Sequence, residues 1–256
     1  MKRKNKLDYL RLSETLGSQL FYFDKVDSTM NEARNLINNH KLKDGAIILA
    51  ETQSGGKGRR GRAWDSPKGG VWLTYVITPF LDREQYPLYT LMSAVAITEL
   101  LIGSFPCQIK WPNDIILHEK KLCGIAVDLV VNRKDYLSIG IGINVYNEVI
   151  DTGIKIADFK RLDINDLVIN LVKSLENYKE VLEATPHKIL DLWRKYNNTL
   201  DNEVIVYPAD KSAPYRAKAL DIAPDGSLIV QSNGELKNIL AADVSLRVKR
   251  DGENGN

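Results

Sequence analysis

A change of pattern near residue 199 constrains the fold more than any other feature of this 256-residue chain. Before that point, strand-like apolar runs alternate with helical patterns, among them an almost wholly apolar helix at 88–102 and an amphipathic helix at 163–183. After it, short strand patterns follow one another, separated by turn sequences such as Pro224-Asp225-Gly226 and Ser232-Asn233-Gly234. We therefore expect an α+β fold, with a mixed β-sheet flanked by helices over residues 1–198 and a small β-barrel over residues 199–256.

Runs of apolar, β-branched and aromatic residues mark the expected strands. In the first part they cover 21–26, 45–51, 71–78, 107–111, 115–118, 122–131 and 136–145. A helix is expected to begin at Ser28, which is a good N-cap, and another at Pro186 behind the cap Thr185. In the second part the expected strands cover 203–207, 215–222, 227–231, 235–240 and 244–248.

The composition is that of an ordinary globular protein, with 44% hydrophobic and 27% charged residues. The net charge is only +2, which excludes a generally basic surface but allows a local basic patch. Cys107 and Cys123 lack metal-ligand spacing and are expected to be buried thiols in a reducing compartment. The chain shows neither a signal-peptide core nor an apolar run long enough to span a bilayer. We therefore expect a cytoplasmic protein without a membrane contact.

Residues 55–62 read Gly-Gly-Lys-Gly-Arg-Arg-Gly-Arg and are followed by Ala63 and Trp64. Glycine lets backbone N–H groups approach a ligand closely, and Lys and Arg bind carboxylate and phosphate groups. Such a loop can enclose a small anion or lie on a polyanion. Enclosure is favoured because the loop follows an expected buried strand, is rich in glycine, and ends in an aromatic ring that can stack on a base. The loop matches neither a P-loop nor a dinucleotide-binding fingerprint, since no Gly-Lys-Ser/Thr opens a helix and no helix is expected behind it.

Four further segments combine polar side chains with a restricted backbone. Residues 110–114 (Lys-Trp-Pro-Asn-Asp) place a cation, an amide and a carboxylate around a rigid bend, and residues 121–125 (Lys-Leu-Cys-Gly-Ile) interrupt a strand with glycine. Residues 140–145 (Gly-Ile-Gly-Ile-Asn-Val) put alternate glycines on one strand face, and residues 27–29 (Asp-Ser-Thr) open a helix. Each segment also has a purely structural explanation: a turn, a bulge, a tight sheet crossing or N-capping. Because the histidines do not cluster and no Ser–His–Asp pattern is present, any chemistry must rest on positive charge and positioning.

In their order along the chain, these segments closely resemble the biotin protein ligases, also called biotin–[acetyl-CoA carboxylase] ligases. The resemblance runs from about Phe21 to Arg247, and it rests on the segments in combination. It implies a class II synthetase-like biotin/lipoate ligase catalytic domain followed by an SH3-like barrel. It also implies a reaction in which biotin is activated with MgATP to biotinyl-5′-AMP and pyrophosphate. The biotinyl group then passes to one lysine of a biotin carboxyl carrier domain.

The resemblance implies roles for the residues at matching positions. Lys110 would lie between the biotin carboxylate and the phosphate as the main catalytic cation, together with Arg59. The residues implied for biotin are Ser28, Thr29, Gln53, Lys57, Gly58, Arg59, Lys110 and Gly124, and those for ATP and the adenylate are Arg59, Arg62, Trp64, Lys110, Asn113, Lys121 and Asn144. Asp114 is a further candidate, for deprotonating the acceptor lysine or for holding magnesium, and no other metal ligand is assigned.

Three positions depart from the family's pattern. Met30 stands where Asn is frequent, which puts a polar contact there in doubt. Lys57 stands where Arg is common, which keeps the charge but loses the bidentate fork, and Cys123 replaces a more usual Ala. None of these changes removes a group that the mechanism needs.

Some members of the family also repress transcription through an additional N-terminal winged helix-turn-helix domain. Only about twenty residues precede the first expected strand, which is too few for such a domain, so we expect a monofunctional ligase without specific DNA binding. The family often forms homodimers through its sheets, but the sequence determines neither the oligomeric state nor the carrier protein. Two alternatives stay open: a lipoate–protein ligase, which shares the fold but lacks this loop sequence, and a nucleic-acid-binding module in which the loop cations clamp phosphates.

Overall fold

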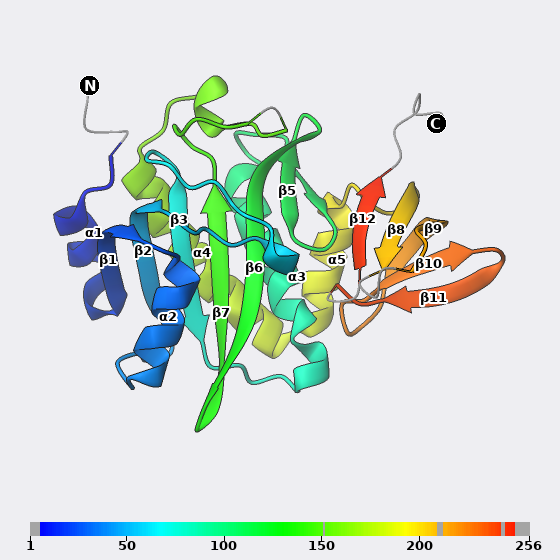
Figure 1. Cartoon of the computed structure of the whole chain (residues 1–256), viewed down its shortest axis with the longest axis horizontal. Helices are drawn as coiled ribbons and strands as arrows, with labels where there is room; N and C mark the ends of the chain where they lie inside the picture. The colour runs from blue at the N-terminus through cyan, green and yellow to red at the C-terminus, as the bar shows by residue number, and fades with distance from the viewer. Residues whose placement is uncertain (1–5, 151, 209–211, 242–243, 249–256) are drawn as a thin grey trace.

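A computed structural model describes residues 6–150, 152–208, 212–241 and 244–248. Its first part is built on a mixed seven-stranded sheet with the order β1-β2-β3-β7-β6-β5-β4 (Figure 1). The strands are β1 (Leu20–Val26), β2 (Ala46–Gln53), β3 (Val71–Ile77), β4 (Gln108–Lys110), β5 (Asp114–Leu117), β6 (Lys120–Asn132) and β7 (Lys134–Ile143). β1 runs parallel to β2, and the other neighbouring strands are antiparallel. The predicted mixed sheet is therefore confirmed.

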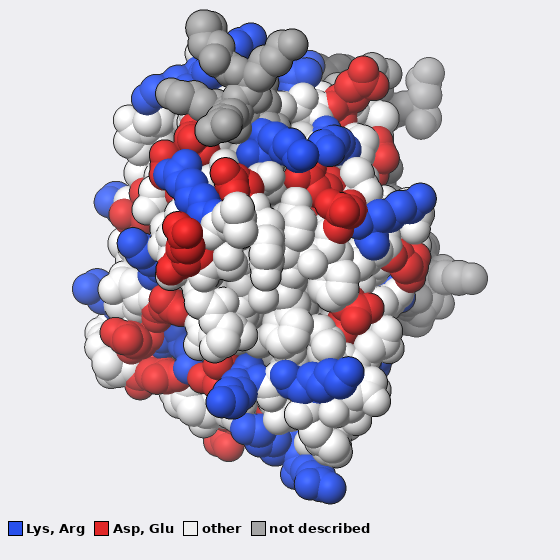
Figure 2. Space-filling model, turned by 90° about the vertical axis from the view of Figure 1, so that its left-hand side faces the viewer, with Lys and Arg blue, Asp and Glu red and all other residues white. Residues whose placement is uncertain are grey.

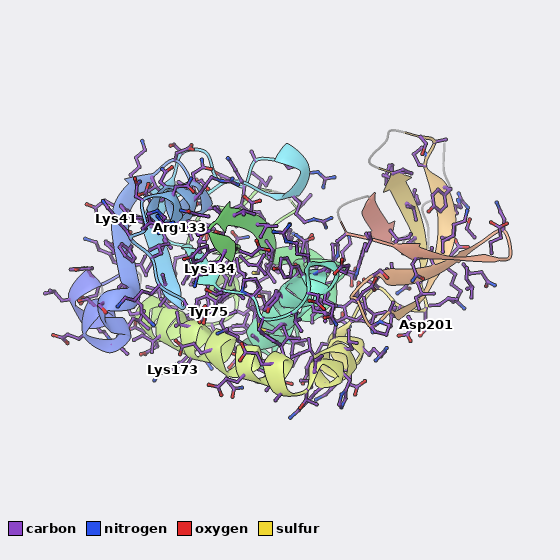
Figure 3. All side chains as sticks on the ribbon, turned by 90° about the horizontal axis from the view of Figure 1, so that it is seen from below. Lys41, Tyr75, Arg133, Lys134, Lys173 and Asp201 are labelled. Atoms are coloured by element: carbon purple, nitrogen blue, oxygen red, sulfur yellow. The ribbon has the colours of Figure 1, made fainter. Side chains whose placement is uncertain are left out.

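Helices cover both faces of this sheet. Helix α2 (Thr29–Asn38) packs on one face, and α3 (Pro87–Leu101) and α4 (Ile164–Ala184) pack on the other. Because both faces of β2 are covered, its successive side chains enter different cores. Ile48 joins a small core with Ala33 and Ile37 of α2, whereas Ile47 and Leu49 join the large core on the other face. Figure 3 shows the second layer from below, with Tyr75 of β3 between the sheet and α4, and Lys173 of α4 directed away from the sheet.

Helix α3 is buried on almost every side, as its apolar sequence predicts. It lies against the sheet on one side and against α4 and α5 (Pro186–Tyr196) on the other. A helix without a polar face needs this central position, because any exposed side would leave apolar surface in water. Pro87 and Pro186 both stand in the first turn of their helices, where no backbone N–H is required.

The second part of the chain is a five-stranded antiparallel sheet with the order β11-β10-β9-β8-β12. Its strands are β8 (Glu203–Pro208), β9 (Tyr215–Ile222), β10 (Leu228–Ser232), β11 (Glu235–Ile239) and β12 (Val244–Val248), as expected of the predicted SH3-like barrel. The turn at Asn233 and Gly234 has positive φ at both residues, which is the backbone that an Asn-Gly hairpin turn requires. Asp201 lies beside this sheet at the far end of the molecule in Figure 3.

The two parts share one hydrophobic core, and buried hydrogen bonds join them. The Trp111 backbone N–H donates to Thr199 Oγ1 over 2.9 Å, and the Trp111 indole N–H donates to the Gly226 carbonyl over 3.4 Å. Trp111 is 2% exposed and Thr199 is 0% exposed. These contacts hold the turn between β9 and β10 against the first part, while the domain boundary at residue 199 stays a prediction.

Two details at the start of the chain differ from the sequence analysis. Helix α1 (Tyr9–Leu16) precedes the first strand and was not expected; Asp8 caps it by accepting a hydrogen bond from the Arg11 backbone N–H. The helix is only 8 residues long, too short to show a sustained apolar period. At α2, Ser28 occupies the N-cap position as predicted, but its side chain makes no capping hydrogen bond.

The face of the molecule that carries α1 and β1 is shown in Figure 2. Uncharged residues fill the centre of this face, and acidic and basic side chains alternate around them. Cations on this face therefore do not gather into one continuous patch. Within the described part of the chain, no helix is both long and apolar enough to cross a membrane.

Candidate functional site

Two adjoining cavities lie between the 55–64 loop and the central strands β6 and β7. The larger cavity has a volume of about 240 Å³ and is bordered by the loop, the 110–114 turn and the segment after β7. The smaller cavity, of about 50 Å³, is bordered by the loop, the start of α2 and the glycines of β6 and β7. Segments that lie far apart in the sequence thus form one connected site.

The structure brings together every predicted site residue except Lys110. The smaller cavity is lined by Ser28, Thr29, Met30, Gln53, Lys57, Gly58, Arg59, Trp64, Asn113, Lys121 and Gly124, and the larger by Gly58, Arg59, Arg62, Trp64, Asn113, Asp114, Lys121 and Asn144. Lys110 lines neither cavity, because it ends β4, the outermost strand of the sheet, on the far side of β5. The assignment of Lys110 as the central cation therefore finds no support in the cavity geometry.

Lys121 lies where the two cavities meet. Its Nζ atom is 2.7 Å from Asp114 Oδ1 and 4.8 Å from the centre of the Trp64 ring. The ion pair and the cation–π contact hold the ammonium group in place across β6. The residues that line both cavities are Gly58, Arg59, Trp64, Asn113 and Lys121, so the cations at the junction are Arg59 and Lys121.

Glycines of β6 and β7 form the floor of the site. Gly124 and Gly142 lie opposite each other in the sheet, and the Trp64 indole covers both. A Cβ atom at Gly142 would lie 2.4 Å from Trp64 Nε1, and a Cβ at Gly140 would lie 2.6 Å from Met30 Sδ. The predicted glycine floor is therefore present, and Met30 packs on it with its thioether.

Gln53 satisfies the first backbone N–H of α2, that of Thr29, which an N-cap side chain such as that of Ser28 does not serve. Its Oε1 atom accepts hydrogen bonds from the Thr29 backbone N–H over 2.8 Å and from Thr29 Oγ1 over 3.0 Å. The Ser28 side chain, 2% exposed as a residue, instead lines the smaller cavity. The Asp-Ser-Thr segment therefore does more than cap a helix, because its polar groups border a cavity.

Arg59 connects the loop to both parts of the chain. Its guanidinium donates to Asn113 Oδ1 over 3.0 Å and to the Ala241 carbonyl of the second part. Asn113 in turn donates from Nδ2 to the Ile125 carbonyl over 2.6 Å. The loop is thus fastened over the sheet by a residue that also lines both cavities. Lys57 donates to Asn31 Oδ1 over 2.8 Å at the outer rim.

Sequence reasoning missed Asn147, which borders the larger cavity beside Asn144. Asn147 Nδ2 donates to Asn144 Oδ1 over 3.0 Å, and Asn147 Oδ1 accepts from the Val145 backbone N–H over 3.0 Å. Asn147 is 2% exposed, so its amide fixes the orientation of the Asn144 amide from behind. The sequence signal that could have indicated Asn147 is that a second Asn follows closely after the Gly-Ile-Asn-Val segment at 142–145. Glu148, Val149 and Thr152 also border this cavity and carry no such signal.

The two cysteines take no part in the site. Both are free and buried, as predicted, and burial raises the pKa of the Cys107 thiol to about 11 and that of Cys123 further. A neutral buried thiol is a poor nucleophile and a poor metal ligand. Among the described residues, no group of three or more His, Cys, Asp or Glu side chains is arranged to hold a metal ion.

Comparisons with known proteins find relatives of this sequence and of this fold. Residues 22–144 match the biotin/lipoate A/B protein ligase family. The bifunctional ligase/repressor BirA of Bacillus subtilis is 30% identical over 91% of this chain and 76% of its own length. A biotin protein ligase from Aquifex aeolicus, solved in complex with biotin and ATP, is 25% identical, with a TM-score of 0.77 over 91% of this chain and 100% of its own.

This chain belongs to the biotin/lipoate A/B protein ligase family. The BirA protein of Escherichia coli is a similar relative, 30% identical over 92% of this chain and 76% of its own length.

Proposed function

We propose that this protein is a biotin–protein ligase, which activates biotin with ATP and transfers it to a lysine of a biotin carboxyl carrier domain. The observation that carries the proposal is the junction of the two cavities, where the cations Arg59 and Lys121 lie between a pocket suited to a small polar ring and a pocket suited to a nucleotide. Its relatives include a biotin–[acetyl-CoA-carboxylase] ligase of Paracoccus denitrificans and the Aquifex protein that binds biotin and ATP.

In the first step, a biotin carboxylate oxygen forms a bond to the α-phosphorus of ATP, and the bond to the pyrophosphate leaving group breaks. Two anions must approach each other, so the barrier contains their repulsion and the charge that develops on the phosphate. Lys121 offsets both because its ammonium borders both cavities, and Arg59 adds a second donor from the loop. We propose Lys121, in place of Lys110, as the central cation.

The biotin ring is proposed to bind in the smaller cavity. Ser28, Thr29 and Gln53 supply the polar contacts, and Met30 and Gly124 form its apolar surface. The nucleotide is proposed to bind in the larger cavity, with Trp64 and Asn144 against the base and ribose and Arg62 towards the phosphates. Lys57 and Gly58 close the loop over the reacting groups.

In the second step, the acceptor lysine amine attacks the biotinyl carbonyl carbon, the carbon–oxygen bond of the anhydride breaks, and AMP leaves. Asp114 is proposed to take the proton of the incoming ammonium. It lies 2.7 Å from Lys121, so a proton received there stays beside the leaving phosphate.

Magnesium is expected to accompany ATP, and the residues present fit it. Asp65, Asp114 and Glu148 border the larger cavity with carboxylate oxygens, which Mg²⁺ prefers. They form no three-ligand cluster among the described residues, which suits an ion held chiefly by the polyphosphate. Bound there, Mg²⁺ would supply positive charge that offsets the negative charge of ATP.

The carrier domain is proposed to approach along β6. Within the described part of the chain, β5 pairs with β6 only as far as Gly124, which leaves 126–132 without a strand on that side. An exposed strand edge can accept a further strand, from a carrier or from a second copy of this chain. A homodimer therefore stays a prediction, which light scattering at increasing protein concentration would test. The cytoplasmic location and the absence of specific DNA binding stay predictions as well.

The test is a thermal-shift and exchange experiment. Biotin with MgATP should raise the melting temperature more than either ligand alone, because the adenylate binds only the folded protein. Exchange of labelled pyrophosphate into ATP should require biotin. Exchange that requires lipoate instead would replace the proposal with lipoate–protein ligase. Salt-sensitive binding of DNA or RNA without any exchange would favour the nucleic-acid-binding alternative.

A further inference from the structure

A continuous chain of buried and part-buried hydrogen bonds runs beside the smaller cavity. Thr74 Oγ1 donates to Thr29 Oγ1 over 2.9 Å, and Thr29 Oγ1 donates to Gln53 Oε1 over 3.0 Å. Gln53 Nε2 donates to Ser66 Oγ over 2.8 Å, and Ser66 Oγ donates to the Trp64 carbonyl over 3.0 Å. The chain thus joins β3, α2 and β2 to the segment that carries Trp64.

The Trp64 carbonyl, at one end of this series of hydrogen bonds, determines which group donates and which accepts in each of them. A carbonyl only accepts hydrogen bonds, so the Ser66 hydroxyl must donate to Trp64 and offer its oxygen to Gln53. Gln53 must then present Nε2 to Ser66 and Oε1 to Thr29. The opposite amide orientation would bring Nε2 against the Thr29 backbone N–H, where two donors would face each other.

Burial makes this arrangement strict. Thr74 is 0% exposed, Ser66 2% and Thr29 3%, so water does not readily replace a lost partner of their hydroxyl groups, while Gln53 between them is half-buried at the cavity. The loop backbone is shaped around the same point: a Cβ atom at Gly56 would lie 2.3 Å from the Trp64 carbonyl oxygen and 2.6 Å from Ser66 Oγ. Glycine is therefore required at position 56 for Ser66 to reach its partners.

We infer that Ser66 is a positioning residue for biotin recognition, because it fixes the Gln53 amide in the orientation that supports the start of α2. The inference rests on the proposed function. Ser66 borders neither cavity, whereas Gln53 and Thr29 both line the smaller one. Ser66 therefore acts through Gln53 and contacts no ligand itself. It also anchors the Trp64 carbonyl, and so links the biotin pocket to the end of the loop.

Ser66→Ala tests the inference, with Ser54→Ala as the matched control. Ser54 directly precedes the 55–64 loop, as Ser66 follows it, but Ser54 is exposed, and its hydroxyl donates to the Val26 carbonyl over 3.4 Å at the rim of the strand pair. Ser66→Ala leaves Gln53 Nε2 without its acceptor, so calorimetry should show about tenfold weaker biotin binding. Ser54→Ala should bind biotin within about twofold of the unaltered protein.

A double-mutant cycle separates positioning from mere structural support. In a Gln53→Met background the amide is gone, so adding Ser66→Ala should change biotin affinity by less than about twofold. Unchanged biotin affinity in Ser66→Ala would overturn the inference. An equal loss in both backgrounds, with a lowered melting temperature, would also overturn it, because Ser66 would then act on folding alone. Absence of biotin binding by the unaltered protein would instead count against the proposed function.

Discussion

The Lys121 ammonium, which borders both cavities, lies 2.7 Å from the Asp114 carboxylate, which borders the larger one. Asp114 lies on β5 and Lys121 on the neighbouring strand β6, so this ion pair is held by the sheet backbone rather than by a flexible loop. A cation held by a partner on a rigid element needs little reorganisation when charge develops beside it.

Lys121→Met should reduce biotin-dependent pyrophosphate exchange by at least about a hundredfold, because it removes the cation between the two reacting anions. Lys110→Met is the matched comparison, since Lys110 lines neither cavity. It should retain most of the exchange activity. If Lys110→Met abolished exchange and Lys121→Met did not, the assignment made from the sequence resemblance would be right. Circular dichroism of both variants checks that the fold is kept.

Gly142→Ala should weaken ATP binding, because the added methyl group would lie 2.4 Å from Trp64 Nε1 and push the indole off the floor. We expect the KM for ATP to rise about tenfold. Gly103→Ala is the control, as no atom lies within 4 Å of a Cβ at that position. An unchanged KM in Gly142→Ala would show that the position of Trp64 over Gly142 is not needed for nucleotide binding.

Arg59→Gly should release the adenylate prematurely. The variant loses the hydrogen bonds of Arg59 to Asn113 and to the Ala241 carbonyl, so the loop is no longer fastened to the second part of the chain. Free biotinyl-5′-AMP would acylate lysines of unrelated proteins. Streptavidin blotting after incubation with serum albumin measures this labelling. Labelling no stronger than that of the unaltered enzyme would contradict a retaining role for Arg59.

The contact between α5 and β9 should weaken in acid. Hydrogen bonds from Arg194 hold the pKa of Asp221 below its ordinary value, with Arg194 Nε 2.7 Å from Asp221 Oδ1. A carboxylate with a lowered folded-state pKa stabilises the protein above its unfolded pKa of about 3.9 and loses that contribution as the pH falls through the folded value. The side chains are 36% and 47% exposed, so solvent screening limits the contribution to about 0.5 kcal/mol.

Urea denaturation of Asp221→Asn measures this contribution. The variant should be less stable than the unaltered protein at about pH 7, and the difference should vanish at about pH 2. A difference that persisted at the lower pH would mean that Asp221 acts through packing and not through its charge. Asp191→Asn is a useful comparison. Asp191 contacts the same arginine, Arg194, but from within helix α5, so it does not join α5 to β9.

Local sequence signals predicted most of the fold. The apolar run of α3, the apolar run of β2 and the Asn233-Gly234 turn each have one dominant local cause, and each element was correctly predicted. Helix α1 shows no comparably strong local sequence signal. It is stabilised by tertiary contacts such as the ion pair of Arg11 with Asp163 over 3.1 Å, which no local pattern reveals.

The sequence predicted many of the residues that border the two cavities, but not the role of each residue within the site. The motifs named many of the residues around both cavities, but not the segment 147–153 after β7, because only the glycines, cations and amides in rigid turns form a rare combination. The proposal of Lys121 in place of Lys110 as the central cation rests on Lys121 lining both cavities and Lys110 neither, and the sequence did not show that β4, which carries Lys110, is the outermost strand. Asn147 and Ser66 act through other side chains, and such indirect roles leave little trace in local sequence.

The glycine floor has a consequence for how ligand choice can change in this protein. Gly124, Gly140 and Gly142 present bare backbone, so any substitution there can only subtract space. New shapes of ligand must therefore be accommodated from the opposite wall, where the flexible thioether side chain of Met30 covers Gly140. An engineer who wants this scaffold to accept a bulkier carboxylic acid should leave the sheet untouched and vary only what covers it.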